Sequence, residues 1–241
     1  MALKDGDRGV VLQRDRKTYA VAPHIPCGVV TPELLRKLAD TAEKHGCLAM
    51  KVTSAQRIAL IGLREDQVDA VWEDLGMDPG QMSGHCVRSV KACPGTAYCK
   101  RAQQDSLEVG LEIDRVHHAR KLPGKMKIGV SGCGHQCAET SIKDVGLVGF
   151  KKGWTVLVGG TAGARTRVAQ ALLSELSDAE AVRVVDHIVA YFEQHAREAQ
   201  RLYKIIDRLG LDHLREAIFE REPEIAARER ERSAVEQERS R

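Results

Sequence analysis

The sequence predicts an α+β protein, with a small N-terminal unit followed by a larger unit that carries the candidate site. Three observations support this prediction. Strand-like and helix-like segments alternate over the first 80 residues. Residues 84–167 combine Gly-rich turns with several short apolar segments that predict strands. Residues 178–209 then show the apolar period of helices.

The first unit is expected to alternate strands and helices. Two prolines interrupt its first apolar run and restrict that run to a strand or edge segment. Thr31 followed by Pro32 is typical of a helix start. The expected elements are a strand or edge segment over 19–30, a helix from 32 that Gly46 ends, two strands within 47–63 around a turn at 53–55, and a helix over 66–75. This order predicts a ferredoxin-like unit, to which we assign residues 1–80.

The second unit is expected to form a mixed α/β domain over residues 81–215. Its predicted strands are 126–130, 146–150 and 155–158, and its predicted helices are 166–176, 178–199 and 200–209. Beyond it, residues 216–241 are expected to form a charged tail. The last 21 residues hold six Arg and six Glu with few apolar side chains, which is typical of a solvated helix or a disordered segment.

Composition excludes several classes of protein. The 241 residues are 43% hydrophobic and 29% charged, an ordinary globular composition that needs no disulfides. Nine aromatic residues and a net charge of +3 argue against a nucleic-acid partner. No apolar run reaches about 18 residues, and the N-terminus lacks an apolar signal segment. With an odd number of cysteines, these features predict a cytoplasmic protein with no membrane partner and without disulfides.

Four cysteines form the strongest motif in the sequence. Cys93 and Cys99 are separated by five residues, and Cys133 and Cys137 by three, each pair in a loop rich in small residues. Such thiols are soft ligands for zinc or for an iron–sulfur cluster. The five-residue gap exceeds the usual zinc spacing, and a cluster holds its ligands at wider corners than one ion does, which favours the cluster. A zinc site and unrelated buried or reactive thiols are the alternatives.

Around these cysteines the sequence resembles a known family. The segments KACPGTAYCKRAQQDS, KMKIGVSGCGHQCAE, KDVGLVGFKKGW and VGG, with VTSAQRIALIGL upstream, resemble the sulfite and nitrite reductases, which carry sirohaem coupled to a 4Fe-4S cluster. The resemblance covers about residues 19–210. Typical members contain two copies of the module, whereas this chain holds one, as the small assimilatory-type sulfite reductases do. The resemblance therefore implies either a compact monomer or a homodimer.

The resemblance implies roles for individual residues. The four cysteines of the motif would bind the cluster, and the last of them, Cys137, would also bridge it to the sirohaem iron. Lys125 and Lys127 match the family's Lys-x-Lys, and Arg88 resembles one of its arginines. These three would bind the substrate oxyanion and supply protons, because cations stabilise oxyanions and residues i and i+2 of a strand share a face.

Further residues are expected to hold sirohaem, which carries several carboxylates. The family often has Thr-x-Arg-Gln where this chain has Thr53-Ser54-Ala55-Gln56, so the Arg is missing at position 55. We expect Arg57, on the same strand face, to bind a sirohaem carboxylate or to replace that Arg. Residues 84–167 carry a local charge of +8, which suits an acidic cofactor. The expected sirohaem-binding residues are Thr53, Gln56, Arg57, Arg165 and Arg167.

The remaining cysteines and histidines are expected to take no part in the chemistry. The cysteines outside the motif have no partner at such spacing and are expected to be small buried residues: Cys27, Cys47 and Cys86. His135, between the last two motif cysteines, is expected to pack beside the site and not to bind metal. His117 and His118 are expected to lie at the surface.

These observations together predict a sulfite reductase that makes sulfide in a six-electron reaction at sirohaem coupled to the cluster. The nearest alternative is a nitrite reductase, which needs the same cofactors and the same number of electrons. Further alternatives are a sirohaem-handling or electron-transfer protein without catalysis, and a zinc-stabilised binding module. The chain has no flavin or nicotinamide motif, so the expected partners are sulfite or nitrite and an external electron donor, either ferredoxin-like or a flavoprotein.

Overall fold

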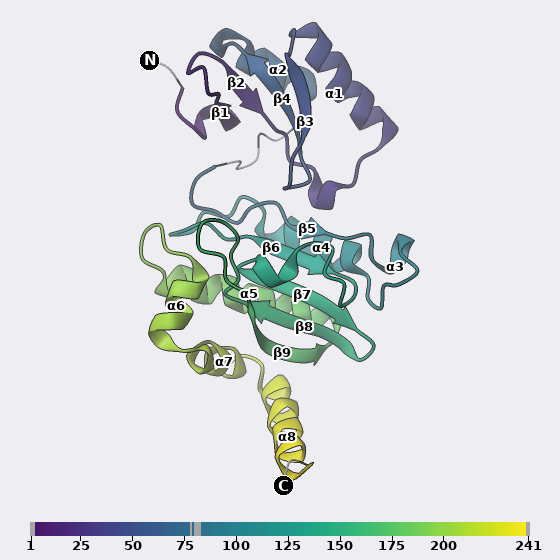
Figure 1. Ribbon diagram of the computed structural model, residues 1–241, viewed down its shortest axis with the longest axis vertical. Helices are drawn as coiled ribbons and strands as arrows, with labels where there is room; N and C mark the ends of the chain where they lie inside the picture. Colours follow the sequence, from purple (N-terminus) through teal and green to yellow (C-terminus); the bar gives the residue numbers. More distant parts are fainter. Residues whose placement is uncertain (1–2, 78, 80–82, 240–241) are drawn as a thin grey trace.

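The computed structural model of the protein describes residues 3–77, 79 and 83–239. These residues form a four-stranded and a five-stranded sheet, each with its own buried core, so the α+β prediction is confirmed (Figure 1). The predicted boundary between residues 80 and 81 lies outside the described residues. No described helix has both the length and the apolar composition that crossing a membrane requires.

The first sheet shares one apolar core with two helices. Its strands are β1 (Val10–Leu12), β2 (Tyr19–Val21), β3 (Ala49–Val52) and β4 (Ile58–Leu63), antiparallel in the order β1-β2-β4-β3. The helices are α1 (Pro32–Lys44) and α2 (Val68–Leu75), and the short 3-10 turns are η1 (Asp7–Gly9), η2 (Pro26–Gly28) and η3 (Glu65–Gln67). The Leu34 N–H donates to the Thr31 hydroxyl at 3.2 Å, which confirms the predicted start of α1. The apolar run over 19–30 forms a strand only as far as Val21.

The second sheet is half parallel and half antiparallel. Its strands follow the chain in order: β5 (Lys91–Ala92), β6 (Ile128–Ser131), β7 (Val145–Phe150), β8 (Gly153–Val158) and β9 (Gln170–Leu176). Strands β5, β6 and β7 are parallel, and β7, β8 and β9 are antiparallel. Helices α4 (Ser106–His117) and α5 (Asp178–His195) share its core, in which Trp154 and Phe192 are fully buried. The predicted strands over 126–130, 146–150 and 155–158 are confirmed as β6, β7 and β8.

The prediction of a helix over residues 166–176 is wrong, because Gln170–Leu176 form β9. Ala, Leu, Gln and Glu favour helices, but here pairing with β8 and burial decide the structure. The register shifts along the β8–β9 pair, and the consecutive residues Leu172 and Leu173 are both buried. A bulge of this kind removes the strict alternation by which a strand is recognised in sequence.

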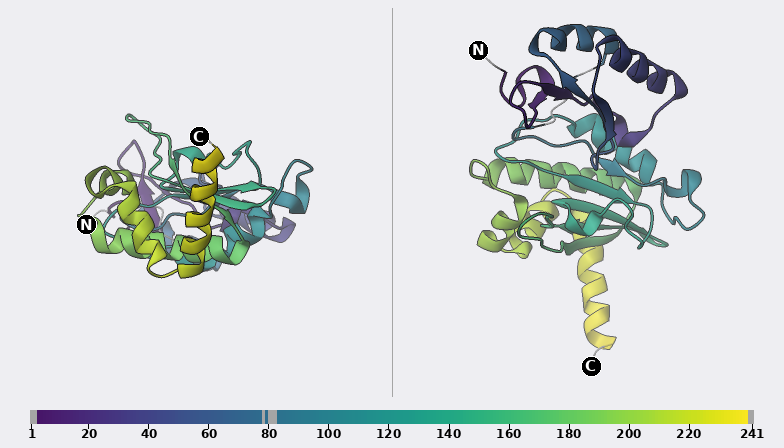
Figure 2. Two further views of the ribbon diagram at one scale, coloured as in Figure 1. Left: turned by 90° about the horizontal axis from the view of Figure 1, so that it is seen from below. Right: turned by 45° about the horizontal axis from the view of Figure 1, so that its top comes forward.

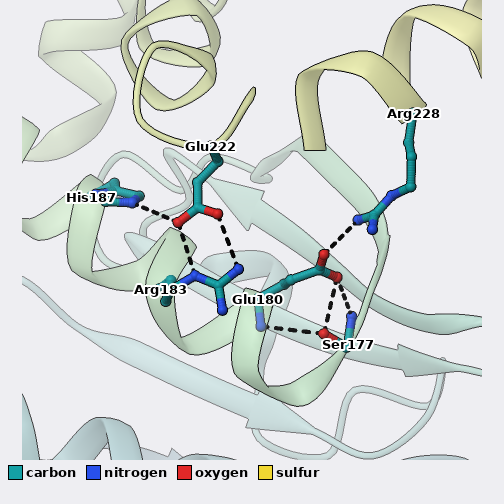
Figure 3. Close-up of polar contacts among 6 residues, drawn as sticks. All are labelled: Ser177, Glu180, Arg183, His187, Glu222 and Arg228. Carbon is teal, nitrogen blue, oxygen red and sulfur yellow. Dashed lines mark hydrogen bonds and ion pairs between the residues drawn. The ribbon is translucent and has the colours of Figure 1, made fainter. Parts of the chain in front are cut away.

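Three helices follow α5. They are α6 (Leu202–Leu209), α7 (Leu211–Phe219) and α8 (Pro223–Arg239), and α8 projects from the rest of the molecule (Figure 1, Figure 2). Ion pairs fix the base of α8 to α5 (Figure 3). Glu222 accepts hydrogen bonds from Arg183 Nε and Nη2 at 2.9 and 3.0 Å and lies 3.0 Å from His187 Nε2. Arg228 lies 2.8 Å from Glu180 at the start of α5. These contacts anchor the base of the charged segment to α5.

Candidate active site

Two adjacent parallel strands bring the cysteine loops together at one edge of the second sheet. Cys93 directly follows β5, and Cys133 lies two residues after β6. The carboxyl ends of neighbouring parallel strands meet at the same edge, where α/β sheets commonly bind ligands. The one-turn helix α3 (Gly95–Tyr98) then leads the chain to Cys99, whose N–H donates to Gly95 O at 2.8 Å. Strand pairing thus places two loops, 40 residues apart in sequence, side by side.

Backbone and hydroxyl groups lie close to the sulfur of Cys93. The Gly132 N–H donates to Cys93 Sγ at 3.2 Å. The Ser106 hydroxyl donates to Cys93 O at 2.9 Å, and its oxygen lies 3.1 Å from the same sulfur. A Cβ at Gly132 would lie only 2.6 Å from Gln104 O, so this approach of the two loops requires glycine. N–H groups directed at a cysteine sulfur stabilise its thiolate and tune the potential of a bound cluster.

The four thiols of the motif are not gathered around a single point in the structure. One tetrahedral zinc ion holds its sulfur ligands within about 4 Å of one another. Among the described residues, no three of these thiols lie within 4.8 Å of one another. Cys93 and Cys133 are buried, Cys99 is partly exposed and Cys137 is exposed, and all four are free of disulfides.

A cationic cavity of about 350 Å³ lies between the turn that joins β3 to β4 and the strands β5 and β6. Of the described residues that line it, none is acidic and six are Lys or Arg: Arg57, Arg88, Lys91, Lys125, Lys127 and Lys143. Ser89 and Ala22 complete one wall. So much positive charge without acidic residues is typical of an anion-binding site. The structure therefore brings together Arg88, Lys125 and Lys127, as the sequence predicts, and adds Lys91 and Lys143.

Lys125 and Lys127 lie on either side of Met126, immediately before β6. Met126 is fully buried and both lysines line the cavity, so the two ammonium groups face the same side. Burial lowers the pKa of both lysines, and the positive charges of neighbouring Lys and Arg side chains lower it further. A lowered pKa makes each ammonium group a stronger proton donor to a bound anion.

Asp144 fixes the backbone of Lys127 from beneath the cavity. Its fully buried carboxylate accepts the Lys127 N–H at 2.8 Å. Arg201, in the loop before α6, donates to the two carboxylate oxygens from Nε at 2.8 Å and from Nη2 at 2.7 Å. Burial raises the pKa of Asp144, and the bidentate Arg201 guanidinium opposes that shift. The C-terminal helices are thereby connected to the position of a cavity lysine.

Glu139 holds two further cavity lysines from outside the lining. Its Oε1 lies 3.0 Å from Lys91 Nζ and its Oε2 lies 3.0 Å from Lys143 Nζ. Hydrogen bonds from Lys143 and then Lys91 lower the pKa of Glu139 to about 2. Glu139 follows Cys137 by two residues, so the same loop carries a cluster cysteine and the carboxylate that orients these lysines. The contact with Lys143 is a local i,i+4 pair, whereas the contact with Lys91 depends on pairing between distant segments, for which the sequence offers no signal.

The segment Thr53–Arg57 is a turn, so the strand alternation expected for positions 55 and 57 does not apply. Thr53 Oγ1 accepts the Arg57 N–H at 3.2 Å and closes the turn. Arg57 is only 3% exposed. Its Nε donates to Ser89 Oγ at 2.8 Å and its Nη1 donates to Ala22 O at 2.9 Å. These bonds fix the guanidinium in the cavity wall, which Thr53 and Ala55 also line.

Gln56 contacts the strand that leads to the cluster cysteines. Its Nε2 donates to Ala92 O at 2.9 Å, and its Oε1 accepts the Ala92 N–H at 3.1 Å. Ala92 directly precedes Cys93. Gln56 is absent from the described residues that line the cavity, so its amide positions the Cys93 strand relative to the first sheet.

Arg165 and Arg167 are not among the described residues that line the cavity. Arg167 Nη1 lies 2.5 Å from Asp207, and its guanidinium is 5.6 Å from the centre of the Tyr203 ring. Arg165 is exposed. Their proposed contact with sirohaem carboxylates therefore stays a prediction, and no contact in the structure links either residue to the cationic cavity.

The prediction of a surface position is wrong for His117, and His118 is only partly exposed. His117 is 1% exposed, with Nε2 lying 2.5 Å from Asp186 of α5. His118 stacks on His24 with ring centroids 3.4 Å apart. Both residues end or follow α4, whose C-terminus is packed against neighbouring segments. Of the other cysteines, Cys27 and Cys86 are buried as expected, whereas Cys47 is partly exposed.

Two family models match the chain. Residues 11–77 match the nitrite/sulfite reductase ferredoxin-like half domain, and residues 83–225 match the nitrite and sulphite reductase 4Fe-4S domain. The assimilatory-type sulfite reductase of Nitratidesulfovibrio vulgaris is 38% identical over 217 residues, which cover 90% of this chain and 100% of that protein. The NAD(P)H nitrite reductase of Bacillus subtilis is 34% identical over 207 residues, but these cover 86% of this chain and 26% of that protein.

Solved structures agree with this assignment at the level of the fold. A dissimilatory sulfite reductase I has a TM-score of 0.72 at 16% identity, over 83% of this chain and 68% of that chain. The NirA protein of Mycobacterium tuberculosis has a TM-score of 0.72 at 20% identity, over 92% of this chain and 44% of that chain. The 4Fe-4S domain model alone spans more than half of the sequence, and it includes all four cysteines and most of the cationic cavity. The chain therefore belongs to the nitrite and sulfite reductase family.

Proposed function

We propose that this protein reduces sulfite to sulfide in a six-electron reaction, with sirohaem and a 4Fe-4S cluster as cofactors. The observation that carries the proposal is the cationic cavity, which lies beside the strands that lead to the cysteine loops. The match over the full length of an assimilatory-type sulfite reductase favours sulfite as the substrate. Reduction of nitrite to ammonium is the second candidate, because nitrite reductases match most of this chain.

The residues present suit both cofactors. Cys93, Cys99, Cys133 and Cys137 would hold the cluster, and Cys137, the last of the four, would also connect it with sirohaem, as the resemblance implies. The cavity cations suit the carboxylates of the macrocycle as well as the substrate. When bound, the two cofactors would supply electrons to the substrate, and an external donor, ferredoxin-like or a flavoprotein, would reduce them in turn. The working form is either a monomer or a homodimer.

The cavity side chains would divide two tasks between them. The guanidinium groups of Arg57 and Arg88 would bind substrate oxygens and stay charged throughout, because arginine keeps its proton in proteins. Lys125 and Lys127 would bind the same oxyanion through Nζ–H groups and transfer protons from Nζ as sulfur–oxygen bonds break. Their lowered pKa favours this transfer. Asp144 would hold the Lys127 backbone in place during the reaction.

Substitution of Lys127 by methionine tests the proposal. Holoprotein with about five irons per chain, four in the cluster and one in sirohaem, is assayed for sulfite and nitrite turnover with a reduced viologen dye. Lys127→Met should keep the iron content and the visible spectrum while kcat/KM for sulfite falls about 100-fold. Lys17→Met, in the exposed turn between β1 and β2, is the matched control and should leave kcat/KM unchanged.

Three outcomes would contradict the proposal in different ways. Faster turnover of nitrite than of sulfite would assign the second candidate. Full cofactor content without turnover of either anion would indicate an electron-transfer protein. Colourless protein that holds zinc would reject the cluster.

A further inference from the structure

A chain of hydrogen bonds runs from a buried carboxylate to the wall of the cationic cavity. Asp114 Oδ2 lies 2.6 Å from His24 Nε2, and His24 Nδ1 lies 3.0 Å from Ser89 Oγ. Ser89 lines the cavity. The three residues come from separate segments: His24 follows β2, Ser89 precedes β5 and Asp114 lies within α4. The fold thus places a carboxylate, an imidazole and a hydroxyl in series behind the proposed substrate site.

The hydrogen-bond partners fix the direction of this chain. Asp114 is 2% exposed and accepts the Val90 N–H at 2.9 Å through Oδ1, so its Oδ2 is the acceptor for a proton on His24 Nε2. Ser89 Oγ accepts the Nε–H of Arg57 at 2.8 Å. A serine hydroxyl has a single hydrogen. When His24 is neutral, that hydrogen bonds His24 Nδ1; when His24 is charged, Nδ1–H donates to Ser89 Oγ and the hydroxyl hydrogen is directed to the cavity.

We propose that Ser89 donates a proton to the oxyanion in the cavity and that His24, positioned by Asp114, replaces it. The Ser89 O–H proton moves to an oxygen of the anion while the His24 Nδ1 proton moves to Ser89 Oγ. Neutral His24 keeps its Nε2–H bond to Asp114 and regains a proton from solvent water, which reaches the 11% of its side chain that is exposed. This inference rests on the proposed function, in which each sulfur–oxygen cleavage consumes protons.

The groups around His24 suit this role. Asp114 of α4 offers a negative charge to the imidazolium, and Arg57 donates to the Ser89 hydroxyl that the imidazole contacts. His118 stacks on one face of the ring at 3.4 Å and 7°. Burial, together with the nearby Asp114, raises the pKa of the Cys27 thiol to about 12, so this neighbour stays neutral. Histidine is the side chain that changes charge near neutral pH, which a proton donor of this kind requires.

The same cluster is a poor metal site. His24, Asp114 and His118 bring their ligand atoms within 4.8 Å of one another. However, His24 Nε2 and Asp114 Oδ2 are 2.6 Å apart, whereas two ligands about 2.0 Å from one tetrahedral zinc ion are about 3.3 Å apart. The lone pairs of two stacked, nearly parallel imidazoles also point side by side and do not converge on one ion. The contact between His24 and Asp114 is therefore a hydrogen bond.

Proton uptake on anion binding tests the inference without turnover. Calorimetric titration of holoprotein with sulfite at neutral pH, in two buffers of different ionisation enthalpy, counts the protons taken up. His24→Asn keeps an amide near Ser89 but carries no exchangeable charge. The matched control is His45→Asn, because His45 Nε2 also lies 2.6 Å from a carboxylate, that of Asp74, with 10% of its side chain exposed.

The wild type and His45→Asn should take up the same number of protons, and His24→Asn fewer, by up to about one proton per chain. Equal uptake in all three proteins would overturn the inference. This measurement needs binding of sulfite and not its reduction, so it decides the role of His24 even in a protein without turnover. Absence of turnover of either anion by the wild type would refute the proposed function but not the inference about His24.

Kinetics give the second measurement. His24→Asn and Ser89→Ala should each lower kcat about 100-fold and keep the KM for sulfite within about threefold, with iron content and spectrum unchanged. The double variant should be no slower than the slower single variant, because the two residues act in one chain. The change of kcat with pH that an imidazole contributes should be absent from His24→Asn. Wild-type kcat in either single variant, or losses that multiply in the double variant, would overturn the inference.

Discussion

The amide of Gln56 pairs with both backbone groups of Ala92, at 2.9 and 3.1 Å, as a neighbouring strand would. One partner lies in the turn between β3 and β4, and the other directly precedes the first cluster cysteine. The same turn lines the cavity through Thr53 and Arg57. The Gln56 side chain therefore joins the turn of the first sheet to the strand that supplies Cys93, beside the contact of Arg57 with Ser89.

Gln56→Ala should destabilise the protein by about 1–3 kcal/mol, because it leaves the Ala92 N–H and C=O without their partners. Urea unfolding of the wild type and the variant measures the difference. Gln13→Ala, which removes a side-chain bond to Val11 O at 3.1 Å from the first sheet, is the control and should cost less than about 1 kcal/mol. Equal losses of unfolding free energy in the two variants would show that the Ala92 pairing contributes no more to stability than an ordinary side-chain hydrogen bond.

Arg201→Met should be the most destabilising of the charge-removing substitutions. It leaves the fully buried Asp144 carboxylate without its bidentate partner, a change that typically costs about 3–5 kcal/mol. Arg201→Lys should recover part of this loss, because it restores the charge but not the planar fork. The control is Arg167→Met, whose partner Asp207 is half exposed, with an expected cost below about 1 kcal/mol. Urea unfolding ranks the three variants, and a loss in Arg201→Met no larger than that in Arg167→Met contradicts the prediction.

Glu139→Gln should change how the stability of the folded protein depends on pH. The pKa of Glu139 is lowered from 4.5 to about 2 by its lysine partners, so its ion pairs stabilise the folded state fully above pH 4.5 and are lost as the pH falls through 2. The wild type should therefore have the higher Tm above pH 4.5, and the difference from Glu139→Gln should vanish near pH 2. Thermal unfolding across this range makes the comparison. A Tm difference that persists at the lowest pH would assign the effect to packing.

Lys127→Arg should separate anion binding from proton transfer. The pKa of Lys127 is lowered, so the wild-type site loses positive charge at a lower pH than an ordinary lysine would, whereas arginine stays charged. On the alkaline side, kcat/KM for sulfite should therefore begin to fall at a higher pH in Lys127→Arg than in the wild type. At neutral pH, kcat should be lower in the variant, because the guanidinium does not release a proton. Identical pH profiles would show that Lys127 does not titrate during the reaction.

The sequence predicts those parts of the site that depend on residue type and short spacing. Four cysteines in two loops identify a soft-ligand site wherever the loops lie. Lys125 and Lys127 share a side because a single extended residue, Met126, lies between them. The start of α1 is equally local, since the Thr31 hydroxyl caps a helix that begins at the next residue. Such features need no knowledge of the tertiary structure.

Other features depend on contacts between distant segments. Lys91 in β5 and Lys143 before β7 reach the cavity because β5, β6 and β7 pair in parallel, and Glu139, four residues before Lys143, contacts both lysines. His24 and Asp114 are 90 positions apart, so their contact has no sequence pattern. The sequence of β9 favours a helix and becomes a strand through pairing with β8. Arg57 lines the cavity, as expected, but it does so from a turn and not through the strand alternation on which that expectation is based.

The cationic cavity also affects how the two units come together. Where the first sheet packs on the second, Arg57 lies in the same cavity wall as Lys125 and Lys127, and no described lining residue is acidic, although Glu139 pairs with Lys91 and Lys143 from outside the lining. Like charges that approach in a partly buried space repel more strongly than they do in water. An anion bound in the cavity would offset this repulsion, and a ligand that binds only the folded state stabilises it. If the proposed function holds, substrate and cofactor would in this sense be structural components of the protein, as counter-ions between its two sheets.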